Sequence, residues 1–249
     1  MNETYPADFA DILSKEGIND TYVRLSMKDV EGRNMYCDDE AYAAIRERLS
    51  ETESPESGIH LIDTGNYHYM SRVFTSFIDE GYDLLLADHH TDMQEASFGG
   101  LLSCGSWARE VLEKDMNLRT LTVIGPEKFE PGGEEINVNI GGRQITGYVY
   151  KGRNASEGNL PLYISVDKDI MDTSECITNW DQGDLTLSEL GELIGVLSEG
   201  RRVIGADICG GLSENDPGYD AEACTKNTAS DVELIKKLKK IIGHCQLQE

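Results

Sequence analysis

The sequence predicts a three-layer α/β/α fold built on a mainly parallel, doubly wound sheet. Short apolar runs rich in β-branched residues alternate along the 249 residues with segments whose apolar residues recur at helical spacing. This alternation is typical of βαβ units, in which helices cover both faces of a parallel sheet. Several of the apolar runs also end at or near an aspartate, as strands do when they carry polar side chains to one rim of such a sheet.

Each predicted strand is a short apolar run bounded by polar or turn-forming residues. In chain order the strands occupy residues 21–27, 59–63, 83–88, 118–125, 160–167 and 201–208. Apolar residues at helical spacing predict helices between them, over residues 38–50, 68–81, 104–116, 186–199 and 228–244. Candidate N-caps of the last two helices are Thr186 or Ser188 and Thr228 or Ser230.

One segment departs from this alternation. INVNIGGRQITGYVY, within residues 132–152, predicts an antiparallel hairpin that turns at its two glycines and is appended to the main sheet. No internal repeat, low-complexity tract or Pro/Gly/Ser-rich linker divides the chain, so we expect one domain over residues 1–249, with the hairpin as an insertion. Residues 213–230 predict a long polar connection that lies over a site or a subunit contact.

The chain is strongly acidic, with 22 Lys and Arg against 46 Asp and Glu and a formal net charge of −24. Such a surface repels phosphate backbones and anionic lipids, so neither nucleic acid nor a membrane is expected as a partner. A small, cationic substrate or divalent cations held by clustered carboxylates fit the charge better. The six cysteines are scattered, and no stretch resembles a secretion signal or a membrane span, so we expect reduced thiols and a cytoplasmic location.

Aspartates gather where the predicted strands end, at Asp63, Asp88, Asp167 and Asp207. Because the carboxyl ends of parallel strands share one rim, we expect these side chains to converge. Several carboxylates in one cleft of low dielectric repel each other by several kcal/mol unless they take up protons or hold cations. Asp63 and Asp207 could orient ligand histidines, or could cap the helices that follow.

LLLADHHTDMQ, residues 84–94, follows one predicted strand with two acids and two histidines. If this segment is extended, Asp88, His90 and Asp92 alternate on one side and can aim at a common point, whereas His89 faces the other side. An oxygen and nitrogen ligand set without thiolate suits Mn, Fe or Zn. Taken alone, the same residues could form a polar loop that caps the following segment.

SVDKDIMD, residues 165–172, places Asp167 and Asp169 after a later strand. An EF-hand loop does not fit, because Met171 stands where the third oxygen ligand belongs. A phosphatase of the haloacid dehalogenase type also has DxD after a hydrophobic strand, with the first aspartate as nucleophile. That alternative would leave DHHTD unexplained.

Together, DxHxD after one strand and SxDxDxxD after a later strand resemble the ureohydrolase family, which comprises arginase, agmatinase, formiminoglutamase and relatives. The resemblance covers residues 59–210. It implies an arginase-like domain with two Mn²⁺ ions at the strand ends, which Fe, Co or Zn could replace, and a metal-bridging hydroxide that attacks a guanidinium or similar carbon. Its third motif, GGDHS, corresponds less closely to GNYHYMS, residues 65–71, where Asn66 and Tyr67 replace Gly and Asp.

The resemblance assigns the metal ligands residue by residue. One ion would take His68, Asp88, Asp92 and Asp167, and the other would take His90, Asp88, Asp167 and Asp169. Asp169 or a neighbouring acid would also carry a proton to the leaving nitrogen.

Other family residues are replaced. Cys104 stands at the place of a proton-transfer histidine, and it is either a reactive thiol near the metals or a buried inert one. Gly210 stands at the place of a guanidinium-binding glutamate, with Glu214 four residues on, and Thr173 replaces a proline. Loss of that glutamate removes a charge-assisted contact worth about 1.5 to 3 kcal/mol, so arginase activity is not expected.

We therefore expect a metal-dependent hydrolase that acts on a small non-peptide C–N bond in a guanidino, amidino, ureido or amide compound. The main alternative is a family member that binds metal without catalysis, which Cys104 and Gly210 favour. Lesser alternatives are a zinc deacetylase of the histone deacetylase type and the phosphatase above. TNWDQGDLT, residues 178–186, could line the substrate cleft or could enter a helix with Trp180 packed beneath it. Homo-oligomers are frequent in the family, but the sequence itself carries no assembly signal.

Overall fold

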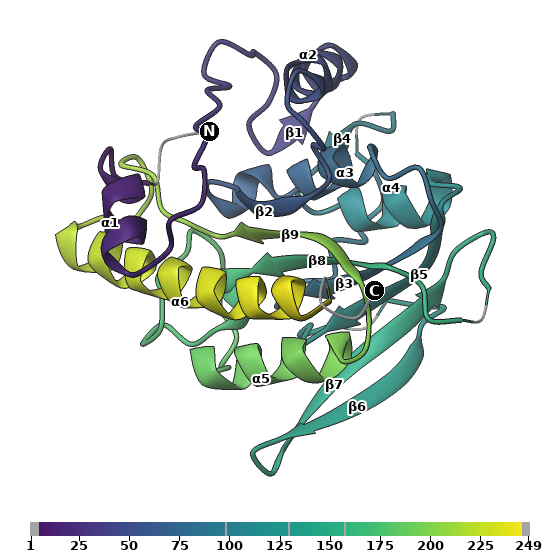
Figure 1. The fold of residues 1–249 in the computed structure, drawn as a ribbon. Helices are drawn as coiled ribbons and strands as arrows, with labels where there is room; N and C mark the ends of the chain where they lie inside the picture. Colours follow the sequence, from purple (N-terminus) through teal and green to yellow (C-terminus); the bar gives the residue numbers. More distant parts are fainter. Residues whose placement is uncertain (1–4, 98, 129, 157, 246–249) are drawn as a thin grey trace.

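A seven-stranded sheet forms the middle layer of the protein, as the computed structural model shows for residues 5–97, 99–128, 130–156 and 158–245. Five strands are parallel and two antiparallel strands extend one edge. Figure 1 shows this sheet between two layers of helices. In sheet order the strands are β2 (Gly58–Leu61), β9 (Val203–Cys209), β8 (Leu162–Asp167), β3 (Tyr82–Ala87), β5 (Leu118–Ile124), β7 (Arg143–Lys151) and β6 (Glu134–Ile140).

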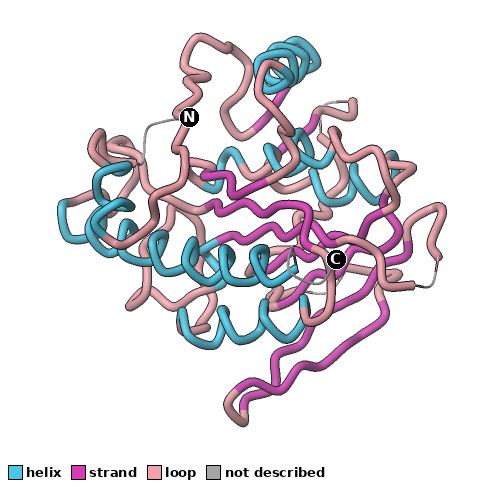
Figure 2. Tube along the Cα trace, viewed as in Figure 1, coloured by secondary structure: helices cyan, strands magenta, loops and turns pink. Residues whose placement is uncertain are grey.

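Helices cover both faces of the sheet, so the chain has the predicted three-layer α/β/α fold (Figure 2). One hydrophobic core includes α2 (Asp39–Ser50), α3 (Met70–Thr75) and α4 (Trp107–Lys114). The core on the opposite face includes α1 (Phe9–Lys15), α5 (Leu187–Ser198) and α6 (Ala221–Cys245). Short elements complete the order: β1 (Tyr36–Cys37), the 3₁₀ turns η1 (Gly65–Tyr67) and η2 (Lys168–Ile170), and β4 (Leu102–Ser103).

The central strands explain why the apolar runs are continuous. In β3, Leu84 and Leu86 belong to one core, whereas Leu85 and Ala87 belong to the other. Successive side chains of a strand point to opposite faces, so a strand covered on both sides needs apolar residues at every position. At the entrance to α5, Thr186 is the N-cap, as one of the two predicted candidates, and it forms a capping box with Glu189.

One predicted strand is wrong, and one predicted helix begins earlier than expected. Residues 21–27 form no strand, because the run is not half-buried: Val23 is 64% exposed, and the segment pairs with none of the described strands. The last helix begins at Ala221, so Thr228 and Ser230 lie inside it. Asp220 takes the capping position, where its carboxylate accepts the N–H of Ala223 at 2.8 Å. The predicted polar connection therefore ends ten residues earlier than expected.

The hairpin lies at one edge of the sheet. β7 pairs antiparallel with β5, and β6 pairs antiparallel with β7. Gly141 and Gly142 make the turn with φ angles of 58° and 89°, a left-handed conformation that favours glycine. Figure 1 shows the hairpin projecting beyond the helices.

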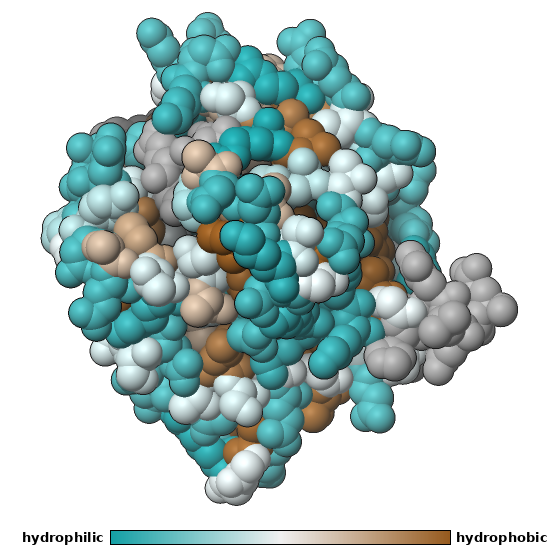
Figure 3. All heavy atoms as spheres, turned by 60° about the vertical axis from the view of Figure 1, so that its left-hand side comes forward, coloured by the Kyte–Doolittle hydropathy of each residue, from teal (hydrophilic) through white to brown (hydrophobic). Residues whose placement is uncertain are grey.

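Hydrophilic residues cover most of the face drawn in Figure 3, and the apolar residues there are confined to small areas. This distribution agrees with a formal net charge of −24. Among the described residues, none of the helices combines the length and the hydropathy that a membrane span requires.

Candidate metal centre

The six residues predicted as metal ligands lie together at the carboxyl ends of neighbouring strands. His68 directly follows η1, the turn after β2. Asp88 follows β3, and Asp167 is the last residue of β8. Because these strands run parallel and lie close together in the sheet, their ends bring the three motifs to one rim. His90 is half-buried, and the other five side chains are buried: His68, Asp88, Asp92, Asp167 and Asp169.

One half of the cluster surrounds His68. Its Nδ1 atom lies 2.9 Å from Asp92 Oδ2 and 3.3 Å from both Asp88 Oδ2 and Asp167 Oδ2. Three carboxylate oxygens therefore face one imidazole nitrogen. This is the ligand set that the resemblance assigns to one ion.

The other half of the cluster surrounds His90. Its Nδ1 atom lies 2.8 Å from Asp169 Oδ2 and 3.6 Å from Asp88 Oδ1. The two oxygens of Asp88 thus face different histidines, as a bridging ligand requires. Asp167 turns one oxygen toward His68, while its Oδ1 accepts the N–H of Asp169 at 3.0 Å.

Asp92 reaches the cluster differently from the extended arrangement that the sequence suggested. Its φ angle is 50°, so the chain turns back at this residue instead of continuing the strand. The indole Nε1 of Trp107 donates to Asp92 Oδ2 at 2.6 Å, and the N–H of Ala108 donates to the Asp92 carbonyl at 3.1 Å. Sequence reasoning missed Trp107, because an aromatic residue in a helical repeat predicts only core packing.

The Nε2 atoms of His68 and His90 also have polar partners. Nε2 of His68 lies 2.9 Å from the hydroxyl of Ser165, which in turn donates to Asp207 at 2.7 Å. Nε2 of His90 lies 3.2 Å from Asp181 Oδ1. A histidine that ligates a metal through one nitrogen is commonly oriented through the other in this way. Asp207 therefore acts on His68 through Ser165, which is one of the two roles that the sequence left open for it.

The pKa values of the cluster indicate that its carboxylates are not balanced by enough positive charge. The hydrogen bond to Asp169, with help from Asp88, raises the pKa of His90 to about 12. Burial opposes protonation of His68, yet Asp88 and the other acids hold its pKa well above the usual value. Burial raises the pKa of Asp167 to about 6 and that of Asp169 well above its usual value. The pKa values of both histidines and of these two acids are raised, so each of these groups favours its protonated form. A cluster with this property favours the binding of cations.

The same residues fit a pair of divalent ions. Asp88 Oδ2 is buried and makes no hydrogen bond, although it lies 3.3 Å from His68 Nδ1. A buried carboxylate oxygen without a hydrogen bond is costly unless a cation compensates it. Four aspartates would balance two divalent ions, and their oxygens together with two imidazole nitrogens suit Mn, Fe or Zn.

A cavity of about 100 Å³ opens onto the cluster. Cys104 lines it together with Met35, Tyr36 and Gln94. Burial raises the pKa of the Cys104 thiol to about 12, so this side chain stays protonated at neutral pH. His89 does not belong to the lining, and its ring Nε2 lies 4.0 Å from Asp181 Oδ2.

Gly210 explains why no glutamate stands at its position. Its φ angle is 90°, and a Cβ atom there would lie 2.5 Å from Asp167 Oδ1. The backbone therefore packs directly against a predicted metal ligand. Glu214 is exposed and does not line the cavity, so it does not replace the missing carboxylate.

The loop after the second metal motif forms a wall of the cavity. Trp180 lines it, with its ring 6.0 Å from the His90 ring. The N–H of Gly183 donates to the Asp169 carbonyl at 2.7 Å, and the side chain of Gln182 donates to the Met171 carbonyl at 2.9 Å. Of the two interpretations of this loop, the structure therefore favours the cleft wall.

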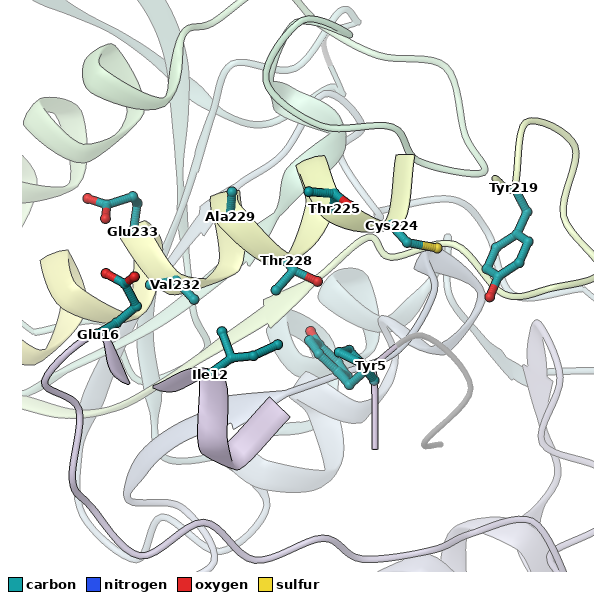
Figure 4. A pocket seen from close by; sticks show the side chains of 11 residues that line it. Tyr5, Ile12, Glu16, Tyr219, Cys224, Thr225, Thr228, Ala229, Val232 and Glu233 are labelled. Atoms are coloured by element: carbon teal, nitrogen blue, oxygen red, sulfur yellow. The ribbon is translucent and has the colours of Figure 1, made fainter. Parts of the chain in front are cut away.

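A larger hollow, of about 600 Å³, lies between the N-terminal segment and α6 (Figure 4). Tyr5 and Ile12 face Thr228 and Val232 across it. It shares no lining residue with the carboxylate cavity. Its lining acids, Glu16 and Glu233, both pair with Lys236.

Comparisons with known proteins show what the chain is similar to. No family model matches it. It is 28% identical over 179 residues to an uncharacterized protein of Thermotoga maritima, a match that covers 71% of this chain and 67% of that protein.

Several solved structures share the fold. Proclavaminate amidino hydrolase from Streptomyces clavuligerus matches with a TM-score of 0.55 and 16% identity, over 82% of this chain and 72% of that one. Formimidoylglutamase from Bacillus subtilis matches with a TM-score of 0.53 and 16% identity, over 88% and 70%. A triple mutant of a T. brucei arginase-like protein, solved with Mn²⁺ bound, matches with a TM-score of 0.52 and 15% identity, over 86% and 70%. The chain thus has the fold of the ureohydrolase superfamily.

Proposed function

We propose that this chain, which has the ureohydrolase fold, is a divergent superfamily member that hydrolyses a small non-peptide C–N bond with two bound Mn²⁺ ions. One observation carries the proposal: the Nδ1 atoms of His68 and His90 point into opposite halves of a four-aspartate cluster that Asp88 joins. The hydrolases with the same fold that act on amidino and related compounds support the reaction class.

Each ion would have its own histidine. One would be held by His68 and Asp92, the other by His90 and Asp169, and Asp88 would serve both, as would Asp167. Bound divalent cations would supply an activated water and would polarise the C–N carbon of the substrate.

The protein's own groups have definable tasks around that chemistry. Asp169 lines the cavity, so its carboxylate lies where it could carry a proton to the leaving nitrogen. Cys104, as a neutral thiol with a pKa of about 12, can donate a hydrogen bond but is a poor base. We assign it to the cavity wall and Asp169 to proton transfer.

Metal content after Mn²⁺ loading tests the proposal directly. We expect two Mn²⁺ per chain in the wild type, and at least one fewer in Asp88→Ala and Asp167→Ala because each removes a shared ligand. His90→Ala should lose one ion, whereas the matched control His89→Ala, whose ring lies outside the cavity, should keep both. Elemental analysis that finds no transition metal in the loaded wild type would refute the proposal.

A screen for product release tests catalysis separately. The Mn²⁺-loaded protein is incubated with guanidino, amidino, ureido and amide compounds, and urea, ammonia and formamide are measured. A protein that holds two metals and turns over none of these compounds would be the non-catalytic member that Gly210 and Cys104 favour.

A further inference from the structure

Trp180 lies where its side chain could contact a bound ligand. It is one of two tryptophans in the chain, and it is 36% exposed although it lines the cavity over the carboxylate cluster. Its ring meets the ring of His90 edge to face, with an interplanar angle of 70°. A large apolar ring left partly open to solvent at a polar cleft is a frequent feature of binding sites.

The position of the indole is held from several sides. Its Nε1 donates to Asn66 Oδ1 at 3.3 Å, and the side chain of Asn179 donates to the same oxygen at 2.9 Å. A Cβ atom on Gly65 would lie 2.5 Å from Trp180 Cδ1, so only glycine allows the ring to lie directly on this turn. The N–H of Gly65 donates in turn to Asn179 Oδ1 at 3.2 Å. The ring is therefore pre-positioned beside His90.

The cavity beside this ring is small. Its volume is about 100 Å³, against about 600 Å³ for the hollow beside α6, and the ions would take part of it. Apart from the residues predicted to hold metals, the described lining carries no charged side chain: Met35, Tyr36, Gly65, Gln94, Ser103, Cys104, Gly105 and Trp180. Gly210 excludes a carboxylate at the position where a guanidinium would otherwise pair.

We propose that Trp180 determines substrate specificity: a compact, planar amide, amidine or ureido group lies against its indole ring over the metal cluster. This inference rests on the proposed function and names its substrate class. Recognition would come from the shape and the planar face of the reacting group, and a long cationic tail would contribute little.

Binding measurements on the Mn²⁺-loaded full-length protein test this inference. Urea, formamide and guanidinium chloride at millimolar concentration serve as compact probes, and arginine serves as the long cationic probe. We expect the compact probes to change the tryptophan fluorescence of the wild type and this change to disappear in Trp180→Phe. By calorimetry, Trp180→Leu should bind the compact probes about tenfold more weakly, as expected when one aromatic packing contact is removed.

Two controls separate the inference from the proposed function. Tyr219→Leu removes an aromatic ring that is 43% exposed at the other hollow, and it should leave probe binding unchanged. Two Mn²⁺ ions per chain should persist in Trp180→Phe and Trp180→Leu. If the metals are bound but Trp180→Leu binds the probes like wild type, or the wild type binds none of them, the role of Trp180 is overturned alone. If the wild type binds no metal, the proposed function fails as well.

Discussion

Trp107 holds Asp92 through a side-chain hydrogen bond at a point where the backbone has left the strand. Both residues are buried, and the bond joins the indole N–H to the oxygen that also faces His68. We expect Trp107→Phe, which keeps most of the ring volume, to lower the affinity for one Mn²⁺ by about 10- to 100-fold. Equilibrium dialysis measures both binding constants. Unchanged affinity at both sites would show that the backbone turn alone orients Asp92.

Gly210 has a backbone conformation and a close contact that leave no room for a side chain. Gly210→Ala should lower the free energy of unfolding by at least about 2 kcal/mol, because a positive φ angle and a Cβ contact with Asp167 add their costs. Urea denaturation gives the value. Gly195→Ala is the matched control, since a Cβ atom there meets nothing within 4 Å, and it should stabilise α5 by about 0.5 to 1 kcal/mol. Gly210→Glu should be at least as destabilising as Gly210→Ala and should not confer arginase activity.

At the scale of elements, a buried ion pair ties the second metal motif to α6. Lys168 lies between Asp167 and Asp169 in sequence, is fully buried, and places its Nζ 2.7 Å from Asp231 Oδ1. Asp231→Ala should lower the free energy of unfolding by about 3 to 5 kcal/mol, because it leaves a buried cation without its partner. Lys168→Met combined with Asp231→Leu should recover most of that loss in urea denaturation. A double variant as unstable as Asp231→Ala would mean that packing, and not charge, governs this contact.

The sequence predicts the strand ends well and the loops after them poorly, for a physical reason. A strand with two buried faces must be apolar throughout, so β3 and β8 are recognisable, and parallel pairing then fixes where Asp88 and Asp167 lie. The turn at Asp92 and the position of Trp180 depend on contacts between segments far apart in the chain. Ala108 holds the first and Asn66 the second. Neither contact can be predicted from the residues that neighbour Asp92 or Trp180 in the sequence.

The same distinction explains the errors in secondary structure. The run at residues 21–27 has the composition of a strand but leaves Val23 exposed and has no strand partner among the described segments. α6 extends back to Ala221 because Asp220 can cap it and the following residues are good helix formers. Thr228 and Ser230 are acceptable inside a helix, so their capping preference did not decide where it begins.

For the whole molecule, metal binding should be linked to pH. The metal-free cluster keeps protons at neutral pH, since the pKa of His90 is raised to about 12 and that of His68 is held well above its usual value. Bound ions must displace those protons, so Mn²⁺ affinity should rise between pH 6 and pH 9, by up to about tenfold per pH unit for each proton released. Titration in weak buffer should show acidification on Mn²⁺ addition. Affinity that is independent of pH would contradict this account of the cluster.

Metal binding should also stabilise the fold as a whole, because the ligands come from three separate segments of the chain at the rim of one sheet. At a free Mn²⁺ concentration 100-fold above the dissociation constant, the gain is about 2.7 kcal/mol, which raises the melting temperature of a chain of this size by about 5 to 10 °C. Differential scanning calorimetry with and without Mn²⁺ measures it. Asp88→Ala should show little or no such shift.

The hairpin has a consequence for solubility. β6 ends the sheet, so its outer edge offers backbone groups that pair with none of the described strands. Glu134 and Glu135 are exposed along it, and like charges on such an edge keep two copies from joining their sheets. This protection depends on ionised carboxylates, and the sequence pI is about 4.5. As the pH falls toward that value, edge-to-edge association should begin at β6. The protein is expected to precipitate near this pH before it unfolds.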